Sequence, residues 1–414
     1  MNKNSLFWTI GYTFINILYF AAFCTIHAYA GIFLLDKGFT NTQVGLALAI
    51  SNILSVFGQP LVAGIIDRGK FLTNRITVMA SSFFLLAGSV ALIFISGEKV
   101  PIFFIFVLMY TVQFVYMPMM IAMNFEYSKA GCKIHFGLAR GMGSAGFAVT
   151  SFFLGKAVKN YGTDIILYVT ISAMAAMVLL VYFYKKPQND ETKKDWGIDN
   201  SDIFENAEKS GVSENEKNGL LSFFKKYPFF MVFLLGAALC FFAHNMINDF
   251  MIQIIRSLGG SETQLGYATF LQAILELPVM AFIGFVLKRI SERHLLVFSA
   301  VSFFIKTAIL IFATSMFGMY VSQSFQMFAY AVFIPAAAYF ADNYMHDKDK
   351  VKGQAFINSA ITLGGVFSNL VCGKILDAFG VKMMLTIGVA VCFIGVAVVV
   401  IAIYPMMAKK VKTE

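Results

Sequence analysis

Residues His27 to Arg68 read HAYAGIFLLDKGFTNTQVGLALAISNILSVFGQPLVAGIIDR, and their pattern returns without a gap 221 residues later, from Asn248 to Arg289. The second stretch reads NDFMIQIIRSLGGSETQLGYATFLQAILELPVMAFIGFVLKR. Glycines and polar loop residues match at this one offset: Gly38 with Gly259, Thr42 and Gln43 with Thr263 and Gln264, Gly45 with Gly266, and Arg68 with Arg289. Unrelated apolar helices would not share loop residues at a fixed offset, so the pattern indicates two related halves.

The composition places both halves in a membrane. The chain has 414 residues, of which 58% are hydrophobic and only 13% are charged, and its mean hydropathy is +0.73. A soluble domain cannot bury so much apolar surface, whereas a bilayer can. Apolar runs long enough to cross about 30 Å of hydrocarbon recur at 8–33, 43–66, 76–96, 102–127, 136–158, 164–184, 228–255, 264–287, 295–313, 317–343, 354–375 and 381–405.

These twelve runs predict an all-α membrane protein, with twelve transmembrane helices in two pseudo-symmetric six-helix bundles. A second echo supports the duplication, because GKAVKNYG at 155–162 is repeated as GKILDAFG at 373–380. We expect an N-terminal bundle at 1–184, a cytoplasmic linker at 185–224 and a C-terminal bundle with a short tail at 225–414. The linker is polar and holds nine of the 23 carboxylates, as is typical of segments without a core. Duplicated membrane halves are typical of secondary transporters whose site lies between the halves.

The distribution of positive charge predicts the orientation. If both termini are cytoplasmic, the cytoplasmic segments hold 23 of the 32 lysines and arginines and the external loops hold seven. This is the positive-inside pattern, and it predicts a multi-pass protein of the cell (inner) membrane with both termini in the cytoplasm. The first span is long and has no small-residue cleavage site, so we interpret it as a retained span. The same bias explains the net charge of +9, and no nucleic-acid partner is expected.

The residue pattern does not predict an enzyme. It has no Ser/His/Asp grouping, no His or Cys cluster with metal-ligand spacing and no phosphate-binding glycine loop beside a P-loop lysine. We therefore expect no cofactor and no metal. The expected partners are the lipid bilayer, a small solute and the proton, with the monomer as the functional unit. A non-transporting sensor is the alternative of a different class, but the sequence offers no soluble output domain for it.

Few ionisable residues remain inside the predicted spans. An unpaired charge at mid-membrane costs about 2.5–3.5 kcal/mol on insertion scales, so such residues usually serve function. Glu126 and Arg140 lie at matching depths on two consecutive spans, which predicts a charge-assisted pair, either static or ligand-binding. Arg140 lies within GLARGMGSAG at 137–146. The small residues there leave space beside the guanidinium for a polyhydroxylated ligand.

A second predicted pair consists of Glu276 and Lys306, on two adjacent antiparallel spans. Movement of the lysine relative to the carboxylate would change the affinity of Glu276 for a proton. Glu276 is therefore the first candidate proton carrier, with Lys306 and Glu126 as its partners in coupling, and a fixed structural pair is the alternative.

Uncharged polar and aromatic residues complete the predicted solute site. Such groups suit a neutral sugar or nucleoside, although a lone amide on a membrane helix more often joins helices. With Glu126 and Arg140, the predicted substrate-binding residues are His27, Phe20, Ser144, Phe147, His244, Asn248, Gln272 and Gln326. Asp249 is a weaker candidate.

Several segments carry a resemblance to a known family: Phe7-Trp8, FGQP at 57–60, HFGLARGMGSAGF at 135–147, GYATFLQAILELPVM at 266–280 and IKTAILIFATS at 305–315. They resemble the oligosaccharide:proton symporter branch of the major facilitator superfamily, which includes lactose permease. The resemblance implies the major facilitator fold. It also places Arg140 at the family's sugar-binding arginine and Lys306 where the family has an arginine.

The chain departs from that family at several positions that the family uses. Ala122 stands at the first of two family glutamates and Glu126 at the second, Phe147 replaces a tryptophan, Ala273 stands at the essential glutamate of helix eight, and Gln326 and Ala329 replace a histidine and a glutamate. Galactoside specificity therefore does not follow from the resemblance. The proton chemistry is expected to fall on Glu276 and Lys306.

The sequence thus predicts proton-coupled uptake of a sugar, either an oligosaccharide or a related neutral polar solute, by alternating access. A nucleoside or a small organic anion is the alternative solute, and the anion is favoured if Arg140 and Lys306 both face the cavity. The loop pairs Asp67-Arg68 and Lys288-Arg289 are predicted to be gates that latch the two halves on the cytoplasmic side.

Overall fold

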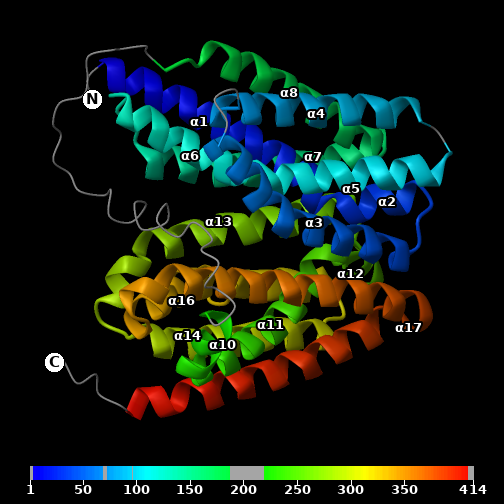
Figure 1. Ribbon diagram of the computed structural model, residues 1–414. Helices are drawn as coiled ribbons and strands as arrows, with labels where there is room; N and C mark the ends of the chain where they lie inside the picture. Colours follow the sequence, from blue (N-terminus) through cyan, green and yellow to red (C-terminus); the bar gives the residue numbers. More distant parts are fainter. Residues whose placement is uncertain (1–2, 69–71, 96, 187–218, 409–414) are drawn as a thin grey trace.

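The structure is a computed structural model, which describes residues 3–68, 72–95, 97–186 and 219–408. Within these ranges the chain forms helices and no strands. The helices lie in two groups, α1–α8 and α10–α17, side by side (Figure 1). The first group comprises α1 (Lys3–Phe23), the π-helix η1 (Cys24–Ala28), α2 (Ala30–Asp36), α3 (Asn41–Arg68), α4 (Asn74–Phe94), α5 (Lys99–Val115), α6 (Met117–Lys129), α7 (Phe136–Tyr161) and α8 (Asp164–Phe183).

The second group follows a segment, 187–218, that lies outside the described residues and contains most of the predicted linker. It comprises α10 (Gly219–Lys226), α11 (Pro228–Asp249), α12 (Met251–Ser257), α13 (Glu262–Leu287), α14 (Glu292–Phe312), α15 (Met316–Ser324), the 3₁₀ turn η3 (Phe325–Met327), α16 (Tyr330–Tyr344), the 3₁₀ turn η4 (Asp347–Asp349) and α17 (Lys350–Ala408). Because α10 begins at Gly219, the end of the predicted linker is helical. We call the two groups the N half and the C half.

The described helices make twelve membrane crossings, as predicted. Ten helical segments are long and apolar enough to span a bilayer. The eleventh is α7, whose 26 residues include the polar Arg140 and Lys156. The twelfth arises because α17, a run of 59 residues, reverses at Gly380, where φ is 77°. A positive φ costs glycine little and other residues more.

The first and seventh spans are broken at equivalent positions of the repeat. The break in the first span is at Tyr29 (φ −105°, ψ 8°), between η1 and α2. The break in the seventh is at Phe250 (φ −111°, ψ 26°), between α11 and α12, and it lies 221 residues later. Irregular backbone inside a membrane protein is tolerated where protein or a cavity surrounds it, so both breaks mark the interior of the transporter-like bundle rather than its lipid surface.

The molecule has two ends, which we call the terminal face and the distal face. The terminal face carries the first and last described residues, Lys3 and Ala408 (left in Figure 1). The distal face carries the turns at Gly38, Gly162, Gly259 and Gly380, all of which have positive φ. Gly38 and Gly259 are equivalent in the repeat, and so are Gly162 and Gly380.

The two halves approach each other closely at the distal face, through glycines. A Cβ atom added to Gly45 of α3 would lie 2.1 Å from the carbonyl oxygen of Asn369 in α17. A Cβ added to Gly266 of α13 would lie 2.5 Å from the carbonyl oxygen of Ser151 in α7. These backbones can touch only because both positions lack a side chain, as at other close helix contacts in membranes. Gly45 and Gly266 are equivalent in the repeat, so the closure is nearly symmetric.

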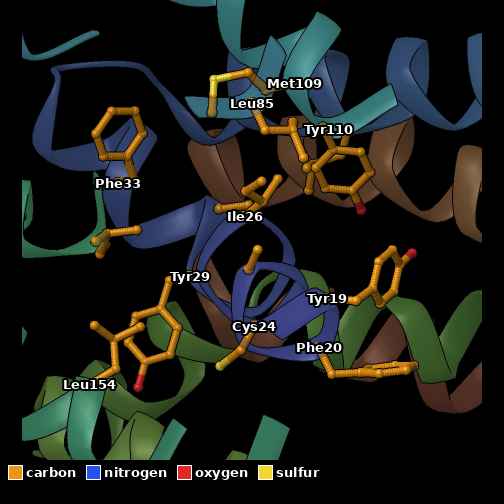
Figure 2. Packing of buried hydrophobic residues seen from close by; sticks show 14 of the residues in the cluster. Tyr19, Phe20, Cys24, Ile26, Tyr29, Phe33, Leu85, Met109, Tyr110 and Leu154 are labelled. Atoms are coloured by element: carbon orange, nitrogen blue, oxygen red, sulfur yellow. The ribbon is translucent and has the colours of Figure 1, made fainter. Parts of the chain in front are cut away.

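The apolar core follows the same division. The larger cluster of buried side chains extends from the N half into the distal part of the C half, where it includes Phe250, Ile254 and Leu265. Figure 2 shows its part around α1 and η1, with Cys24 and Tyr29 among the packed side chains. A second cluster, which includes Phe233, Phe303 and Phe340, belongs to the C half alone. The halves therefore share a core at the distal face.

The terminal face is packed more loosely. Gly64, Gly141 and Gly284, which lie toward that end of α3, α7 and α13, have no heavy atom within 4 Å of an added Cβ. A hollow of about 590 Å³ opens at the start of α7 and is lined by residues 134–138. Among the described residues, the hydrogen bonds that join the two halves lie on the distal side. The structure is thus closed at the distal face.

Candidate functional site

Glu276, Gln326 and Lys306 form a chain of hydrogen bonds inside the C half. The Lys306 ammonium donates to Gln326 Oε1 at 2.6 Å, and Gln326 Nε2 donates to Glu276 Oε1 at 2.8 Å. Lys306 is 0% exposed and Gln326 is 1% exposed. The predicted pairing of Glu276 with Lys306 is therefore indirect, because an amide from another span lies between the two charges.

Gln326 occupies that position because the tenth span is interrupted. The α-helix α15 ends at Ser324, η3 follows, and α16 resumes at Tyr330. The interruption frees backbone groups, and Ser299 of α14 donates to the carbonyl of Ala329 at 2.7 Å. Broken spans in transporters place side chains and backbone groups near the midplane. The break thus delivers an uncharged bridge to two buried ionisable groups.

Arg140 lies on the N-half side of the same region. Its guanidinium lies over the ring of Phe20, 4.2 Å from the centroid, and donates to Ser144 Oγ at 3.2 Å. Cation–π contacts of this kind contribute about 0.5–2 kcal/mol. Phe20 and Ser144 therefore hold one part of the guanidinium, and they leave further N–H donors of its fork for another group.

The interior charges of the two halves act on each other. Arg140 lies within Coulombic range of Glu276 and of Tyr330. Both Arg140 and Glu276 are partly accessible, whereas Lys306 is enclosed. A guanidinium from α7 and a carboxylate from α13 therefore face a common region between the halves.

An aromatic and amide group lies beside this region. The ring of His244 in α11 stacks on Tyr330, with centroids 5.3 Å apart and an interplanar angle of 14°. The Asn248 amide, which can only donate through nitrogen, lies 2.9 Å from His244 Nε2. His244 Nδ1, Asn248 Oδ1 and Gln272 Oε1 are buried and have no hydrogen-bond partner among the described residues. Because unpaired buried polar atoms are rare in native proteins, these three are open positions for a polar ligand.

Two other predicted contacts lie in an aromatic environment of the N half. His27, in η1, stacks on Phe23 at 4.1 Å and lies 3.8 Å from the centroid of Tyr110. Its Nε2 is buried without a partner in the described part of the chain. Phe147 of α7 packs near Phe23, at 6.2 Å. The structure thus places His27 and Phe147 together, next to Phe20.

The predicted pair of Glu126 with Arg140 does not form. The Glu126 carboxylate instead accepts from Lys186 at 2.5 Å and from Asn74 at 3.4 Å. These partners lie at the terminal ends of α8 and α4, so Glu126 faces its own half and not the region near Arg140. Equal depth on neighbouring spans did not reveal the rotation of each helix about its axis.

The predicted gating loops are not latched in this structure. Asp67 and Lys288 are exposed, and Arg289 lies over Phe285 of its own helix, 4.5 Å from the ring centroid. No contact printed for the described residues joins Asp67 to Lys288 or Arg289, and the side chain of Arg68 lies outside the described part. The latch stays a prediction for a state that is closed at the terminal face.

The structure adds a latch at the opposite end that sequence reasoning missed. Asp377 of α17 accepts hydrogen bonds from the backbone N–H groups of Asn41 and Thr42, at 3.1 and 2.7 Å, and from both of their side chains, at 2.8 and 2.6 Å. A carboxylate at a helix N-terminus is stabilised by the unpaired N–H groups and the helix dipole. Gln253 adds a bond to Asn41 at 2.9 Å. One half therefore caps a helix of the other.

We expect the Asp377→Asn variant to loosen the distal closure. The amide keeps one acceptor but loses the charge, and charge-assisted hydrogen bonds are about twice as strong as neutral ones. A loss of about 1 kcal/mol shifts a two-state population about fivefold. The measurement is the labelling rate of Cys372, which is 0% exposed, in a background without the other cysteines. An unchanged rate, with Asp164→Asn as the control at the Lys37 ion pair within the N half, would contradict the latch.

Two halves closed at one end around a polar interior define a membrane transporter of the major facilitator type. The chain belongs to the MFS_1 like family, whose model matches residues 9–387. A relative from Bacillus subtilis (strain 168), described as the uncharacterized transporter YwbF, is 21% identical over 304 residues, which are 73% of this chain and 69% of the relative. A transporter class agrees with the prediction that the chain is not an enzyme.

Solved structures show the same fold at low sequence identity. The nucleoside transporter NupG superposes with a TM-score of 0.74 at 15% identity and covers 99% of this chain and 100% of its own. A bacterial homologue of the human lysosomal transporter Spinster, in an inward-facing and unoccupied conformation, gives a TM-score of 0.71 at 13% identity, with 98% of each chain covered. These likenesses establish the twelve-helix major facilitator fold.

Proposed function

We propose that this chain is a secondary active transporter that couples the uptake of a neutral, hydroxyl-rich solute to the proton by alternating access. The observation that carries the proposal is the relay from Lys306 through Gln326 to Glu276, with Arg140 of the other half in Coulombic range of the carboxylate. Binding of a solute between Arg140 and Glu276 would change the field at the carboxylate and hence its affinity for a proton.

In this proposal the proton binds at Glu276. When Glu276 is ionised, Arg140 and the enclosed Lys306 balance its charge. When it is protonated, its hydroxyl becomes a donor that a solute oxygen can accept. Solute and proton then favour the same state, which is the thermodynamic requirement of symport.

A neutral solute fits the charges better than an anion does. The anion was favoured if Arg140 and Lys306 both faced the cavity, but Lys306 is 0% exposed and its ammonium donates to Gln326. Arg140 is then the one interior cation near the solute region among the described residues, and Glu276 lies opposite it. Paired opposite charges with unpartnered amide oxygens suit hydroxyl groups, which both donate and accept.

We favour a sugar of the oligosaccharide class, in line with the resemblance of the α7 and α13 segments to the oligosaccharide:proton symporters. A nucleoside is the second candidate. The specific observation for it is the set of planar faces at Phe20, Phe147 and Tyr330, which can stack on a base as well as on a sugar. The fold likeness to NupG, named as a nucleoside transporter, is compatible with that candidate.

For orientation, we propose that the terminal face is cytoplasmic and the distal face external, because the positive charges concentrate on the terminal side. The structure then corresponds to an inward-facing state of a protein in the cell membrane. The functional unit in this proposal is the monomer, since both halves of the site come from one chain.

The direct test is a proton-flux screen in proteoliposomes. Di- and trisaccharides, nucleosides and small carboxylates are added in turn, and both solute uptake and internal pH are measured. A sugar that moves protons in step with its own uptake supports the proposal, and a nucleoside that does so selects the second candidate. If no solute is accumulated against its gradient while a proton gradient is present, proton symport of these classes is wrong.

We further expect Gln326→Leu to uncouple transport rather than to weaken solute binding. Both ends of this amide are occupied by Lys306 and Glu276, so Gln326 positions the carboxylate and does not reach the solute. Uphill accumulation should fall at least about tenfold, a loss of about 1.4 kcal/mol of coupling, while solute exchange at equal pH continues. The control is Gln323→Leu, because Gln323 is 0% exposed and its amide has no partner in the described structure. A rise in the KM for exchange would instead assign Gln326 to the solute site.

A further inference from the structure

One buried carboxylate has no part in the relay described above. Asp249 is the last residue of α11, directly before the break at Phe250. Its backbone carbonyl oxygen lies 3.2 Å from the position of an added Cβ on Gly31 in α2, and the ring of Phe250 reaches to 3.4 Å of an added Cβ on Gly45. Asp249 therefore lies at the contact between the halves, on the distal side of His244.

The surroundings of this carboxylate are polar but incompletely bonded. Asn369 of α17 faces it and is 0% exposed, yet neither of its amide atoms has a hydrogen-bond partner in the described structure. Tyr110 of α5, in the other half, lies within Coulombic range of Asp249 and contacts His27, whose Nε2 is also unpartnered. Unpaired buried polar groups are costly, so their presence at one place points to a bound species that completes them.

No cation balances Asp249 in the closed state. The ionisable groups that act on it from the elements packed against it are Tyr110 of α5 and Cys372 of α17. Both side chains are neutral near pH 7. No lysine or arginine of the described ranges acts on this carboxylate. An ionised carboxylate enclosed without a partner costs several kcal/mol, whereas the protonated acid does not carry that cost.

The repeat shows that this acid is not part of the duplicated scaffold. The residue 221 positions earlier is Ala28, at the equivalent break in the first span. The backbone break is thus common to both halves, but the carboxylate belongs to one. A group added on one side of a symmetric contact has a role that the closure itself does not require.

We propose that Asp249 is a second proton site, and that it must bind a proton before the distal face can close. While that face is open, water reaches the carboxylate, and the proton comes from the distal solution to form the carboxyl O–H bond. Closure then brings the neutral acid against Asn369 and Tyr110. Reopening hydrates the group and returns the proton to the same solution. This site gates closure, and Glu276 carries the transported proton.

The inference deepens the proposed function and rests on it for the role of the proton, but its test requires no solute. Spin labels are placed at Tyr161 and Phe379, which are equivalent in the repeat, lie at the distal ends of α7 and α17, and are 77% and 69% exposed. The distance between the labels is measured in lipid nanodiscs from about pH 5 to about pH 9, a range in which enclosed carboxylates titrate.

In the parent protein the population with a long distance should rise with pH. The linkage of one proton to closure allows at most about a tenfold change in the population ratio per pH unit. In Asp249→Asn the short distance should persist at high pH, because the amide is neutral at every pH. Asp164→Asn, which removes a distal carboxylate paired with Lys37 inside the N half, should keep the parent response.

Two results would overturn the inference. One is an Asp249→Asn variant that binds to the membrane and folds like the parent but keeps the full pH response of the distance. The other is closure at high pH on addition of sodium, which would make Asp249 a sodium site. A failed solute screen with an intact pH response would reject the proposed function and leave the proton site standing.

Discussion

Replacement of Glu276 by glutamine is expected to abolish uphill solute accumulation while solute exchange continues. The amide keeps the size of the side chain and can still contact Gln326, but it cannot bind or release a proton near pH 7. Without that step the proton gradient cannot drive the carrier. Accumulation should fall to the level of the external solute, and exchange between equal internal and external pools should stay within about threefold of the parent, since solute contacts change by less than about 1 kcal/mol.

The controls separate coupling from folding. Glu276→Gln leaves Lys306 enclosed with only Gln326 as its partner, and an unbalanced buried charge destabilises a protein by several kcal/mol. The double variant Glu276→Gln/Lys306→Gln should therefore recover thermal stability but remain uncoupled. Glu262→Gln changes a carboxylate on the same helix that pairs with Arg256 at the distal face, and it should accumulate solute normally. Accumulation by Glu276→Gln itself would refute the assignment of the proton carrier.

The second large effect is expected for Arg140→Gln, which should lose solute binding by about 100-fold. Two charge-assisted hydrogen bonds from a guanidinium contribute about 1.5–3 kcal/mol each before compensation by the new side chain. The measurement is solute affinity by calorimetry in detergent, with the melting temperature recorded in parallel. Arg140→Lys should be intermediate, since lysine keeps the charge but not the planar fork.

A matched arginine shows what a structural role would look like. Arg75 donates to the backbone carbonyls of Val181 and Tyr182, at 2.9 and 2.7 Å, and so joins α4 to α8. Arg75→Gln should lower the melting temperature and leave solute affinity unchanged. If Arg140→Gln gave this same result, Arg140 would be a packing residue held by Phe20 and the solute site would have to lie elsewhere.

The repeat was enough to predict the architecture. Hydropathy and the 221-residue offset predicted twelve spans in two halves, because a span must be apolar over a fixed length whatever it packs against. The same information did not predict the breaks at Tyr29 and Phe250, although they lie at equivalent positions. Neither residue is a proline or a glycine, and the irregular backbone there depends on the contacts between the halves.

The site was predicted in its members more than in its connections. Glu276, Lys306 and Arg140 were correctly selected as interior charges, since the cost of a charge in hydrocarbon does not depend on its neighbours. The partners were not readable, because helix rotation and distant spans decide them. Lys186, which follows α8, takes Glu126, and Gln326 enters between Glu276 and Lys306 from the interrupted tenth span. A fully buried amide beside a helix break was the available signal for the bridge.

The contact of Gly266 with Ser151 and Gly155 also fixes the geometry of motion. From Gly266 to Leu287, α13 extends about 32 Å at 1.5 Å per residue. A tilt of about 10° about this contact would move the far end of the helix by about 5 Å, roughly the distance between neighbouring helix turns. Because the distal contact consists of backbone without side chains, it can serve as a pivot with little resistance to such a tilt. The glycine that permits closure at one end is therefore also the point from which the opposite end gains its width.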